Sequence, residues 1–360
     1  MDSYVLKRDV LRGTGATWYR WRNLKPGLYV FNYHRVGDET STRFDPNVFS
    51  CDEEHFDRQL ATITSRFRTT TIREVVELAD GCVELTEPLA LITLDDGYHD
   101  NFTKAFPILK AHRTSAVFFL PTSYVGSTTV PWWDDIARMI RSTDQTNVNL
   151  LGTRVEIDRL QIKYSIRTAL NIFKQSSASI GDKLEEFRAA LGYPSAAEEG
   201  TLFVNWTEVR EMRSAGMDIG SHTDSHRILA HLSEDDQLTE LSQSKQILER
   251  ELGEAIQSIA YPVGGPSTFT SRTEQLAAQC GYRVAFSFVS GVNRNLQAGR
   301  FSLRRMAVEN NAGMEDIRFL GAFSGVNLSV FAPLRTTLRF LKKVSRRLRG
   351  MSGSGAGDVT

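Results

Sequence analysis

The chain has 360 residues, of which 41% are hydrophobic and 24% charged, a composition typical of a globular protein with a sizeable core. Its 43 basic and 43 acidic residues balance, but residues 331–360 hold seven Arg or Lys against one Asp. The rest of the chain is therefore acidic, and nucleic acid is not expected as a partner. The three cysteines lie far apart, which disfavours a cysteine zinc site and fits a reducing compartment.

The N-terminal residues contain no apolar core of signal-peptide length, and no apolar run approaches the about 20 residues that span a bilayer. The sequence therefore predicts a cytoplasmic protein. Residues 1–26 form a polar N-terminal extension to which we assign no chemistry.

Short apolar segments alternate with helical segments over residues 27–325, which predicts α/β architecture with a parallel sheet closed into a barrel. The expected strands are about seven: 27–33, 89–94, 115–120, 217–221, 256–261, 282–288 and 301–308. The expected helices are 53–65, 71–80, 101–112, 205–216, 233–252 and 270–280, with Asn205 and Glu208 forming a capping box. Residues 131–200 break the alternation and are interpreted as a helical insertion with one strand-like run at 152–157.

Polar residues follow directly after the expected strands. They are His34, the pair Asp95 and Asp96, the pair His222 and His226, Tyr261 with Pro262, and residues 291–293. The carboxyl ends of the strands form the face of a β/α barrel where active sites lie. We therefore expect these residues to share one site.

Two adjacent carboxylates end the second strand, and they require a cation if both are buried. Alternatively, Asp96 and Gly97 only form a tight turn. His222 and His226 are four residues apart, so a helical turn would place both rings on one face; alternatively, they lie on a solvated loop. One carboxylate and two imidazoles make a three-ligand set with an open position, as in catalytic zinc sites, and the other carboxylate is then a general base.

The segments Thr93–Gly97 (TLDDG) and 221–226 (SHTDSH) are similar to two motifs of the polysaccharide deacetylases, the carbohydrate esterases of the family 4 type with a NodB homology domain. This resemblance implies a distorted β/α barrel. It also implies that Asp95 is the base and that Asp96, His222 and His226 hold a divalent metal, most simply Zn²⁺.

Two positions depart from the family pattern. The motif Arg-x-Pro-x-Gly reads Ala260–Gly264 here, so its arginine is missing. The Val263 N–H can still face an oxyanion, and Tyr261 is a further candidate to contact the oxyanion or the substrate. Arg304 or Arg305 is the candidate to supply the missing charge; either is equally a structural or surface arginine.

The second departure is the acid, because all seven histidines lie at or before His231 and none falls on the last strand. In a subgroup resembling the circularly permuted poly-N-acetylglucosamine deacetylases, the acid histidine lies on the first strand. His34 is at that place, and first and last strands are neighbours in a closed barrel. The alternative is a core histidine bonded to backbone.

The resulting hypothesis is a metal-dependent hydrolase that removes an N-acyl group, acetyl by preference, from an amino sugar. Metal-bound water is deprotonated by Asp95, Val263 stabilises the oxyanion, and His34 protonates the leaving amine. Trp133 opens the insertion and is a candidate to stack on a sugar ring or to anchor the helix; Asn293 is a candidate substrate contact. The alternatives are an inactive glycan-binding module of the same fold and a sugar N-deformylase.

Residues 331–349 place leucines at helical spacing among Arg and Lys, which predicts a basic amphipathic helix at a membrane surface or a solvated tail. Residues 350–360 are rich in Gly and Ser and are expected to be disordered. A peripheral position at the inner membrane face would make a lipid-linked glycan precursor the substrate.

Overall fold

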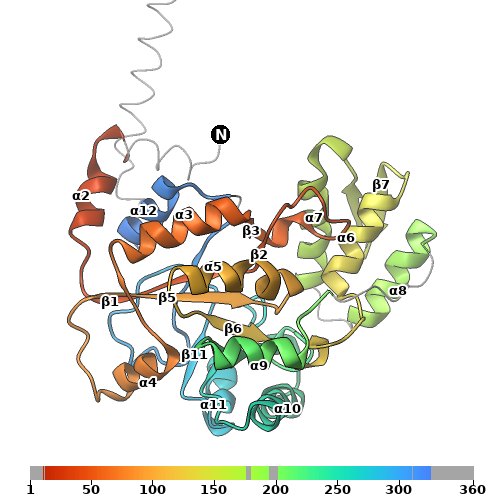
Figure 1. Ribbon diagram of the computed structural model, residues 1–360. Coiled ribbons are helices and arrows are strands. Elements are labelled where there is room, and N and C mark those ends of the chain that lie inside the picture. Colours follow the sequence, from red (N-terminus) through yellow and green to blue (C-terminus); the bar gives the residue numbers. More distant parts are fainter. Residues whose placement is uncertain (1–10, 12, 176–179, 194–201, 310, 326–360) are drawn as a thin grey trace, which may run out of the picture.

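The computed structural model describes residues 11, 13–175, 180–193, 202–309 and 311–325 (Figure 1). The basic helix expected at 331–349 and the tail at 350–360 lie outside the described residues and stay predictions. Within the described part of the chain, no helix combines the length and apolar character needed to cross a membrane.

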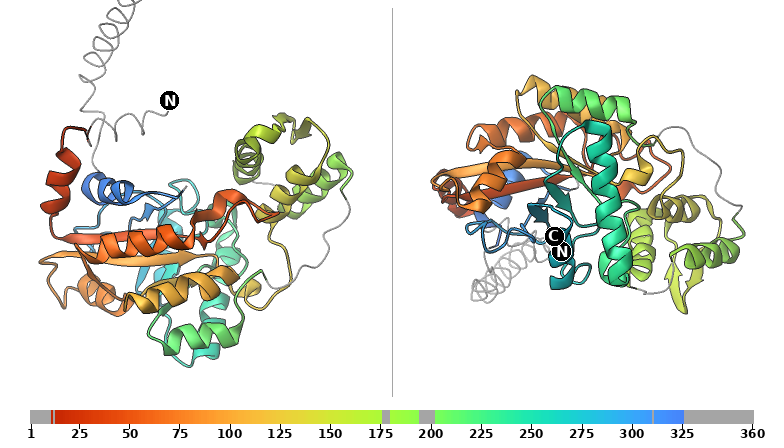
Figure 2. Two further views of the ribbon diagram at one scale, coloured as in Figure 1. Left: turned by 45° about the horizontal axis from the view of Figure 1, so that its top comes forward. Right: turned by 90° about the horizontal axis from the view of Figure 1, so that it is seen from below.

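A parallel sheet forms the centre of the molecule, and helices cover it on both faces (Figures 1 and 2). The strand order is β11-β10-β9-β6-β5-β1-β12, and every pair along it is parallel. The strands are β1 (Gly27–Tyr33), β5 (Pro88–Asp95), β6 (Val117–Leu120), β9 (Asp218–Ser221), β10 (Ser258–Ala260), β11 (Val284–Phe286) and β12 (Met306–Ala307), with β4 (Arg68–Thr69) paired to β5. The expected α/β fold, a distorted barrel, is confirmed.

The sheet curls until its two ends are joined by one segment near the C-terminus. Leu303 exchanges backbone hydrogen bonds with β11, accepting from Ser287 and donating to Ala285. A few residues later, Met306 of β12 pairs with Phe31 of β1. The strand expected over 301–308 is therefore split: only Met306–Ala307 is regular, because the segment crosses from one sheet edge to the other.

The helices between the strands begin and end on local signals in the sequence. The expected capping box forms at α9, where the Asn205 side chain accepts from the Glu208 N–H and the Glu208 carboxylate accepts from the Asn205 N–H. The helix expected at 101–112 begins instead as a π-turn over Asn101–Ala105 before becoming α-helical. The helices are α2 (Ala16–Arg22), α3 (Glu53–Thr64), α4 (Ile72–Asp80), α5 (Phe106–Ala111), α9 (Trp206–Ser214), α10 (Glu234–Leu252), α11 (Ser271–Gln279) and α12 (Met314–Phe323).

Side chains along the two central strands alternate between two apolar clusters. One set of side chains packs with α4 in a cluster inside the barrel, the inner cluster; it includes Leu28 and Val30 of β1 and Leu89 and Leu91 of β5. The residues between them point to the other side of the sheet and pack against the outer helices. This period of two continues past the apolar residues. The next inward positions toward the carboxyl ends are Asn32, His34, Thr93 and Asp95.

The insertion folds around an apolar core of its own beside the carboxyl ends of the strands (Figures 1 and 2). It contains α6 (Trp132–Ser142), the antiparallel hairpin of β7 (Asn147–Leu150) and β8 (Thr153–Glu156), α7 (Ile162–Gln175) and α8 (Ile180–Leu191). The run expected at 152–157 is thus one arm of a hairpin. Asp135 of α6 is buried between Arg138 and Arg188, which ties α6 to α8. The insertion is therefore a packed unit against the barrel mouth.

Gly220 of β9 provides a test of how tightly the sheet packs. A Cβ at this position would lie 2.4 Å from Phe119 Cε1 and 2.9 Å from Ser258 Oγ. Gly220→Ala is expected to lower the free energy of unfolding by about 1–3 kcal/mol, measured by urea denaturation. Gly265→Ala is the control, because a Cβ there meets no atom within 4 Å. Equal stability of the two variants would contradict this packing.

Candidate active site

A buried polar layer lies at the carboxyl ends of β1 and β5, directly beyond the inner apolar cluster. Asp95 Oδ1 accepts a 2.7 Å ion-pair hydrogen bond from Arg305 Nη1, and both side chains are about 2% exposed. Arg305 Nη1 also donates to Asn32 Oδ1, and Arg305 Nε donates to the Ser287 carbonyl. Thr93 Oγ1 donates to the same Asn32 oxygen. The guanidinium is thus bonded both to β1 and to the residue that follows β11, at the two ends of the sheet that the closing segment joins.

The Asp95 carboxylate stays charged in this buried position. Burial alone raises the pKa of Asp95, but the Arg305 guanidinium, followed by His222 and His34, outweighs burial and holds the pKa below its usual value. An ionised carboxylate is the form that a general base requires.

Asp96 also faces the cavity, although neighbouring residues of a strand normally point to opposite sides. The alternation is broken because Asp96 has φ 72° and Gly97 has φ 69°, both in the left-handed region. A side chain at Gly97 would in addition meet Leu120 Cδ2 at 2.7 Å. The turn after β5 therefore lets two adjacent carboxylates enter one site in different orientations.

His222 and His226 lie on an irregular loop after β9, not on the helical turn considered from their spacing. Thr223 and His226 both have positive φ. Side-chain oxygens stabilise the loop: Ser221 Oγ accepts from the Thr223 N–H, and Thr223 Oγ1 accepts from the His226 N–H. The two rings are brought together, with their centroids 4.8 Å apart, by this turn.

Asp96, His222 and His226 offer three ligand atoms that lie within 4.8 Å of one another. The Nε2 atoms of His222 and His226 lie 3.4 and 3.3 Å from Asp96 Oδ1, which is buried and has no hydrogen-bond partner among the described residues. His222 Nδ1 donates to the Ala260 carbonyl at 2.7 Å, which leaves its Nε2 lone pair free for an ion. One carboxylate and two imidazoles fit a divalent metal such as Zn²⁺.

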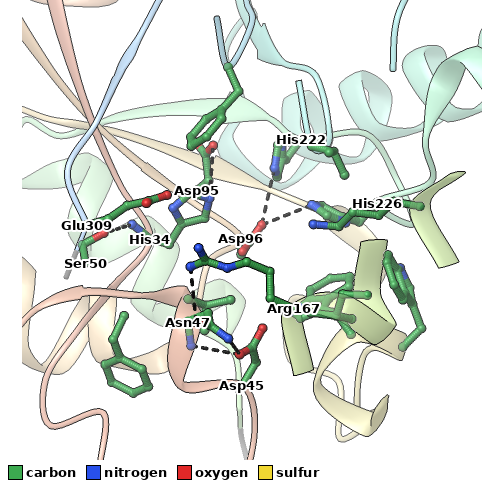
Figure 3. Close-up of a pocket in the computed structure, with 18 of the residues that line it drawn as sticks. His34, Asp45, Asn47, Ser50, Asp95, Asp96, Arg167, His222, His226 and Glu309 are labelled. Carbon is green, nitrogen blue, oxygen red and sulfur yellow. Dashed lines mark hydrogen bonds and ion pairs between the residues drawn. The ribbon is translucent and has the colours of Figure 1, made fainter. Parts of the chain in front are cut away.

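His34 follows β1 on the same inward line as Asn32. Its Nε2 lies 4.0 Å from Asp95 Oδ2, and its side chain is 25% exposed. The His34 N–H donates to Ser50 Oγ, and the Asn101 side chain donates to the His34 carbonyl, so the backbone is fixed on both sides. Figure 3 shows His34 beside Asp95, across the site from His226.

The segment after β10 forms another wall. Val263 has φ 62°, and its N–H donates to no described residue. A Cβ on the next residue, Gly264, would lie 2.6 Å from the Phe288 nitrogen, so the turn packs closely on its neighbour. The Tyr261 hydroxyl donates to the Phe301 carbonyl, and the buried ring closes the wall from behind.

Trp133, at the start of α6, packs on a metal-ligand candidate. Its ring centroid lies 4.4 Å from that of His226, and its Nε1 donates to the Tyr98 hydroxyl, which donates in turn to Asp134 Oδ2. The ring is 5% exposed, so it supports His226 more than it offers an open stacking face. Asn293 is not brought to the site; its side chain bonds the backbone of Leu28 and Arg304.

The site opens into a cavity of about 360 Å³ between the barrel mouth and the insertion (Figure 3). Sequence reasoning did not identify several of the polar residues that line it: Asp45, Asn47, Ser50, Arg167, Asn171, Lys174 and Glu309. Helical spacing of Arg167, Asn171 and Lys174 was the available signal for α7. Asn32, the buried hydrogen-bond partner of Arg305, could also have been predicted from the sequence. It lies two residues before His34, so both side chains point to the same side of β1.

The chain has sequence similarity to known proteins. Residues 83–147 and 178–285 match the sequence pattern of the family described as polysaccharide deacetylase. The protein YxkH of Bacillus subtilis (strain 168), whose name assigns it to the polysaccharide deacetylases, is 23% identical over 297 residues, covering 82% of this chain and 75% of YxkH.

Solved structures share the fold. IcaB from Ammonifex degensii is similar with a TM-score of 0.55 at 19% identity, covering 83% of this chain and 98% of that one. The Streptococcus pyogenes deacetylase PplD, solved in complex with acetate, has a TM-score of 0.53 at 19% identity and covers 81% and 97%. A de-N-acetylase from Aggregatibacter actinomycetemcomitans has a TM-score of 0.53 at 16% identity, covering 81% and 99%.

The ligand set predicts metal-dependent stability. Added Zn²⁺ is expected to stabilise the folded protein by about 4 kcal/mol at 1,000 times the dissociation constant, measured as a rise in melting temperature. His226→Ala is expected to lose most of this rise because it removes one of three ligands. His55→Ala is the control, since His55 pairs with Asp52 away from the cavity. An undiminished rise in His226→Ala would contradict the site.

The Asp95–Arg305 pair predicts a coupled effect on stability. Arg305→Met is expected to lower the free energy of unfolding of the metal-free protein by about 3–5 kcal/mol, because it leaves a buried carboxylate uncompensated. Adding Asp95→Asn removes that charge and is expected to recover part of the loss. Urea denaturation of all four proteins in the cycle measures the coupling, and strictly additive losses would contradict it.

Proposed function

The chain belongs to the polysaccharide deacetylase family, and on that premise we propose that it is a metal-dependent hydrolase that removes an N-acetyl group from an amino sugar. The observation that carries the proposal is the division of the two carboxylates after β5. Asp96 points to His222 and His226, whereas Asp95 is held 2.7 Å from Arg305. The chain thus keeps a ligand set and a separate charged base in one cavity.

Asp96, His222 and His226 would hold the ion. A bound divalent metal, most simply Zn²⁺, would supply Lewis acidity that polarises the acyl oxygen and lowers the pKa of water. The Ala260 carbonyl keeps the His222 ring in the tautomer that ligation requires, and the Trp133 ring limits the movement of His226.

Asp95 acts as the general base. Its carboxylate is ionised because Arg305 and the neighbouring imidazoles stabilise the charge, so it can take a proton from the attacking water. Arg305 fixes one carboxylate oxygen by its 2.7 Å hydrogen bond and leaves the other, Oδ2, directed toward the His34 side of the site. Arg305 thus takes the place of the arginine that is absent from the segment 260–264.

The oxyanion that forms at the acyl carbon needs a donor, and we assign this role to the N–H of Val263, a residue that lines the cavity. The leaving nitrogen needs a proton, and His34 is placed to give it. Its ring lies opposite the ligand histidines, within 4.0 Å of Asp95, and is partly open to the cavity. Acid and base then lie side by side, across the site from the ligand histidines.

The substrate proposed is an N-acetylated amino sugar of a glycan or of a lipid-linked glycan precursor. The family supports a glycan substrate. The name de-N-acetylase, printed for the structural neighbour from Aggregatibacter actinomycetemcomitans, is in keeping with an acetyl amide. Parallel assays with N-formyl and N-acetyl sugars separate acetyl from formyl removal.

Loss of the base or the acid is expected to remove turnover without removing the metal. Asp95→Asn and His34→Gln are each expected to lower kcat by about 10²–10⁴-fold, because proton transfer in the transition state is lost. The measurement is acetate and free amine released from an N-acetylglucosamine oligomer by the Zn²⁺-loaded enzyme.

The same proteins are then tested for the rise in melting temperature with Zn²⁺, which should persist in both variants. His55→Gln, remote from the cavity, is the activity control. Unchanged turnover in Asp95→Asn would refute its role as the base. A wild-type protein that binds zinc and glycan but releases no amine would instead indicate the glycan-binding alternative.

A further inference from the structure

The helix α7 of the insertion presents a polar stripe to the active-site cavity. Arg167, Asn171 and Lys174 all line the cavity, and their spacing of four and three residues places them on one face of the helix. Within the described residues, the insertion adds no carboxylate to the lining of this cavity. The wall that faces the barrel mouth is therefore cationic.

Neither cation is neutralised by an ion pair with a described residue. Arg167 Nη2 makes a 3.3 Å hydrogen bond to Asn47 Oδ1, a neutral amide, and Figure 3 shows its guanidinium extending between Asp96 and Asn47. Lys174 is partly buried, and burial, opposed in part by Asp45, Asp96 and Glu309, lowers its pKa. A partly buried ammonium that forms no ion pair with a described residue favours an anion that enters from outside.

Three carboxylates that line the other walls of the cavity already have partners within the site. Asp95 pairs with Arg305, Asp96 faces the two histidines, and Asp45 accepts the Asn47 N–H and side-chain amide at the start of a short 3₁₀ turn. Glu309 is the remaining acid that lines the cavity, and Figure 3 shows it beside His34. The α7 side of the cavity thus carries two cations available to a ligand.

Lys174 is close enough to the ligand set to act on it. It exerts an electrostatic effect on both Asp96 and His226. Lys174 also lines the same cavity of about 360 Å³ as Asp96 and His226, so a group bound by Lys174 would lie in the cavity that receives the scissile amide. Arg167, seven residues and about two helical turns before Lys174, offers a planar fork suited to an oxyanion.

We propose that Arg167 and Lys174 bind an anionic group, a phosphate or a carboxylate, on the amino-sugar substrate next to the N-acetyl group. This inference rests on the proposed function and adds the substrate class. A neutral glycan would leave both cations without an anionic partner among the described residues, whereas a phosphorylated or uronic-acid-containing sugar would neutralise them.

Three sugars separate the possibilities: N-acetylglucosamine 1-phosphate, a disaccharide of N-acetylglucosamine and glucuronic acid, and neutral di-N-acetylchitobiose. With Zn²⁺-loaded wild-type enzyme, kcat/KM is expected to be at least about tenfold higher for one of the charged sugars than for the neutral one. The sugar that is preferred identifies the source as phosphate or carboxylate. Arg167→Gln and Lys174→Met are each expected to lower this preference by about tenfold.

Arg154→Gln is the matched control, because it removes one positive charge from the insertion on the exposed β7–β8 hairpin, where Arg154 pairs with Glu156. It should leave the preference unchanged. Equal kcat/KM for all three sugars, or a preference that survives in both α7 variants, would overturn the proposal.

Calorimetric binding of the same sugars to the Zn²⁺-loaded enzyme gives a readout that does not depend on turnover. A charged-sugar preference that is lost in Arg167→Gln supports the anion site even where no sugar is hydrolysed, in which case only the proposed function fails. Equal binding of charged and neutral sugars would overturn the anion site while leaving deacetylation intact.

Discussion

The buried ion pair between Asp95 and Arg305 is the interaction on which the site depends. Burying two charges is costly unless their geometry and hydrogen bonds compensate. Here the Asn32 side-chain oxygen, the Ser287 carbonyl and the 2.7 Å contact provide that compensation. Arg305 lies in the segment in which Leu303 bonds to β11 and Met306 pairs with β1, so the ion pair that keeps the Asp95 carboxylate charged depends on the closure of the barrel.

The backbone turn after β5 directs the two neighbouring carboxylates to different partners. Asp95 continues the inward line of the strand, whereas the left-handed conformation of Asp96 and Gly97 redirects the second carboxylate to the histidine loop. Positive φ recurs at His226 and Val263, the other irregular positions that face the cavity. Such conformations persist only where surrounding packing determines them, and here they concentrate around the site.

The insertion changes what the barrel mouth can accept. Because it has its own core and a buried charge cluster at Asp135, it holds α7 as a firm wall opposite the polar layer. Trp133 joins this unit to the metal-ligand candidates by packing on His226. The barrel thus provides the proposed chemistry, and the insertion shapes the space and the charge that a substrate meets.

The sequence by itself determined the alternation of strands and helices, the capping box at Asn205 and the grouping of polar residues after strand ends, because these depend on backbone geometry within one segment. Only the tertiary structure decided between Arg304 and Arg305. Adjacent residues point apart, and Arg304 turns outward to the Ser290 carbonyl, whereas Arg305 meets an aspartate 210 residues earlier. The loop geometry of His222 and His226, the exclusion of Asn293 from the cavity and the cationic face of α7 were likewise decided by contacts between distant segments. The strand register and the closure of the barrel depend on contacts between such segments, and these contacts produce no periodic pattern within any one segment of the sequence.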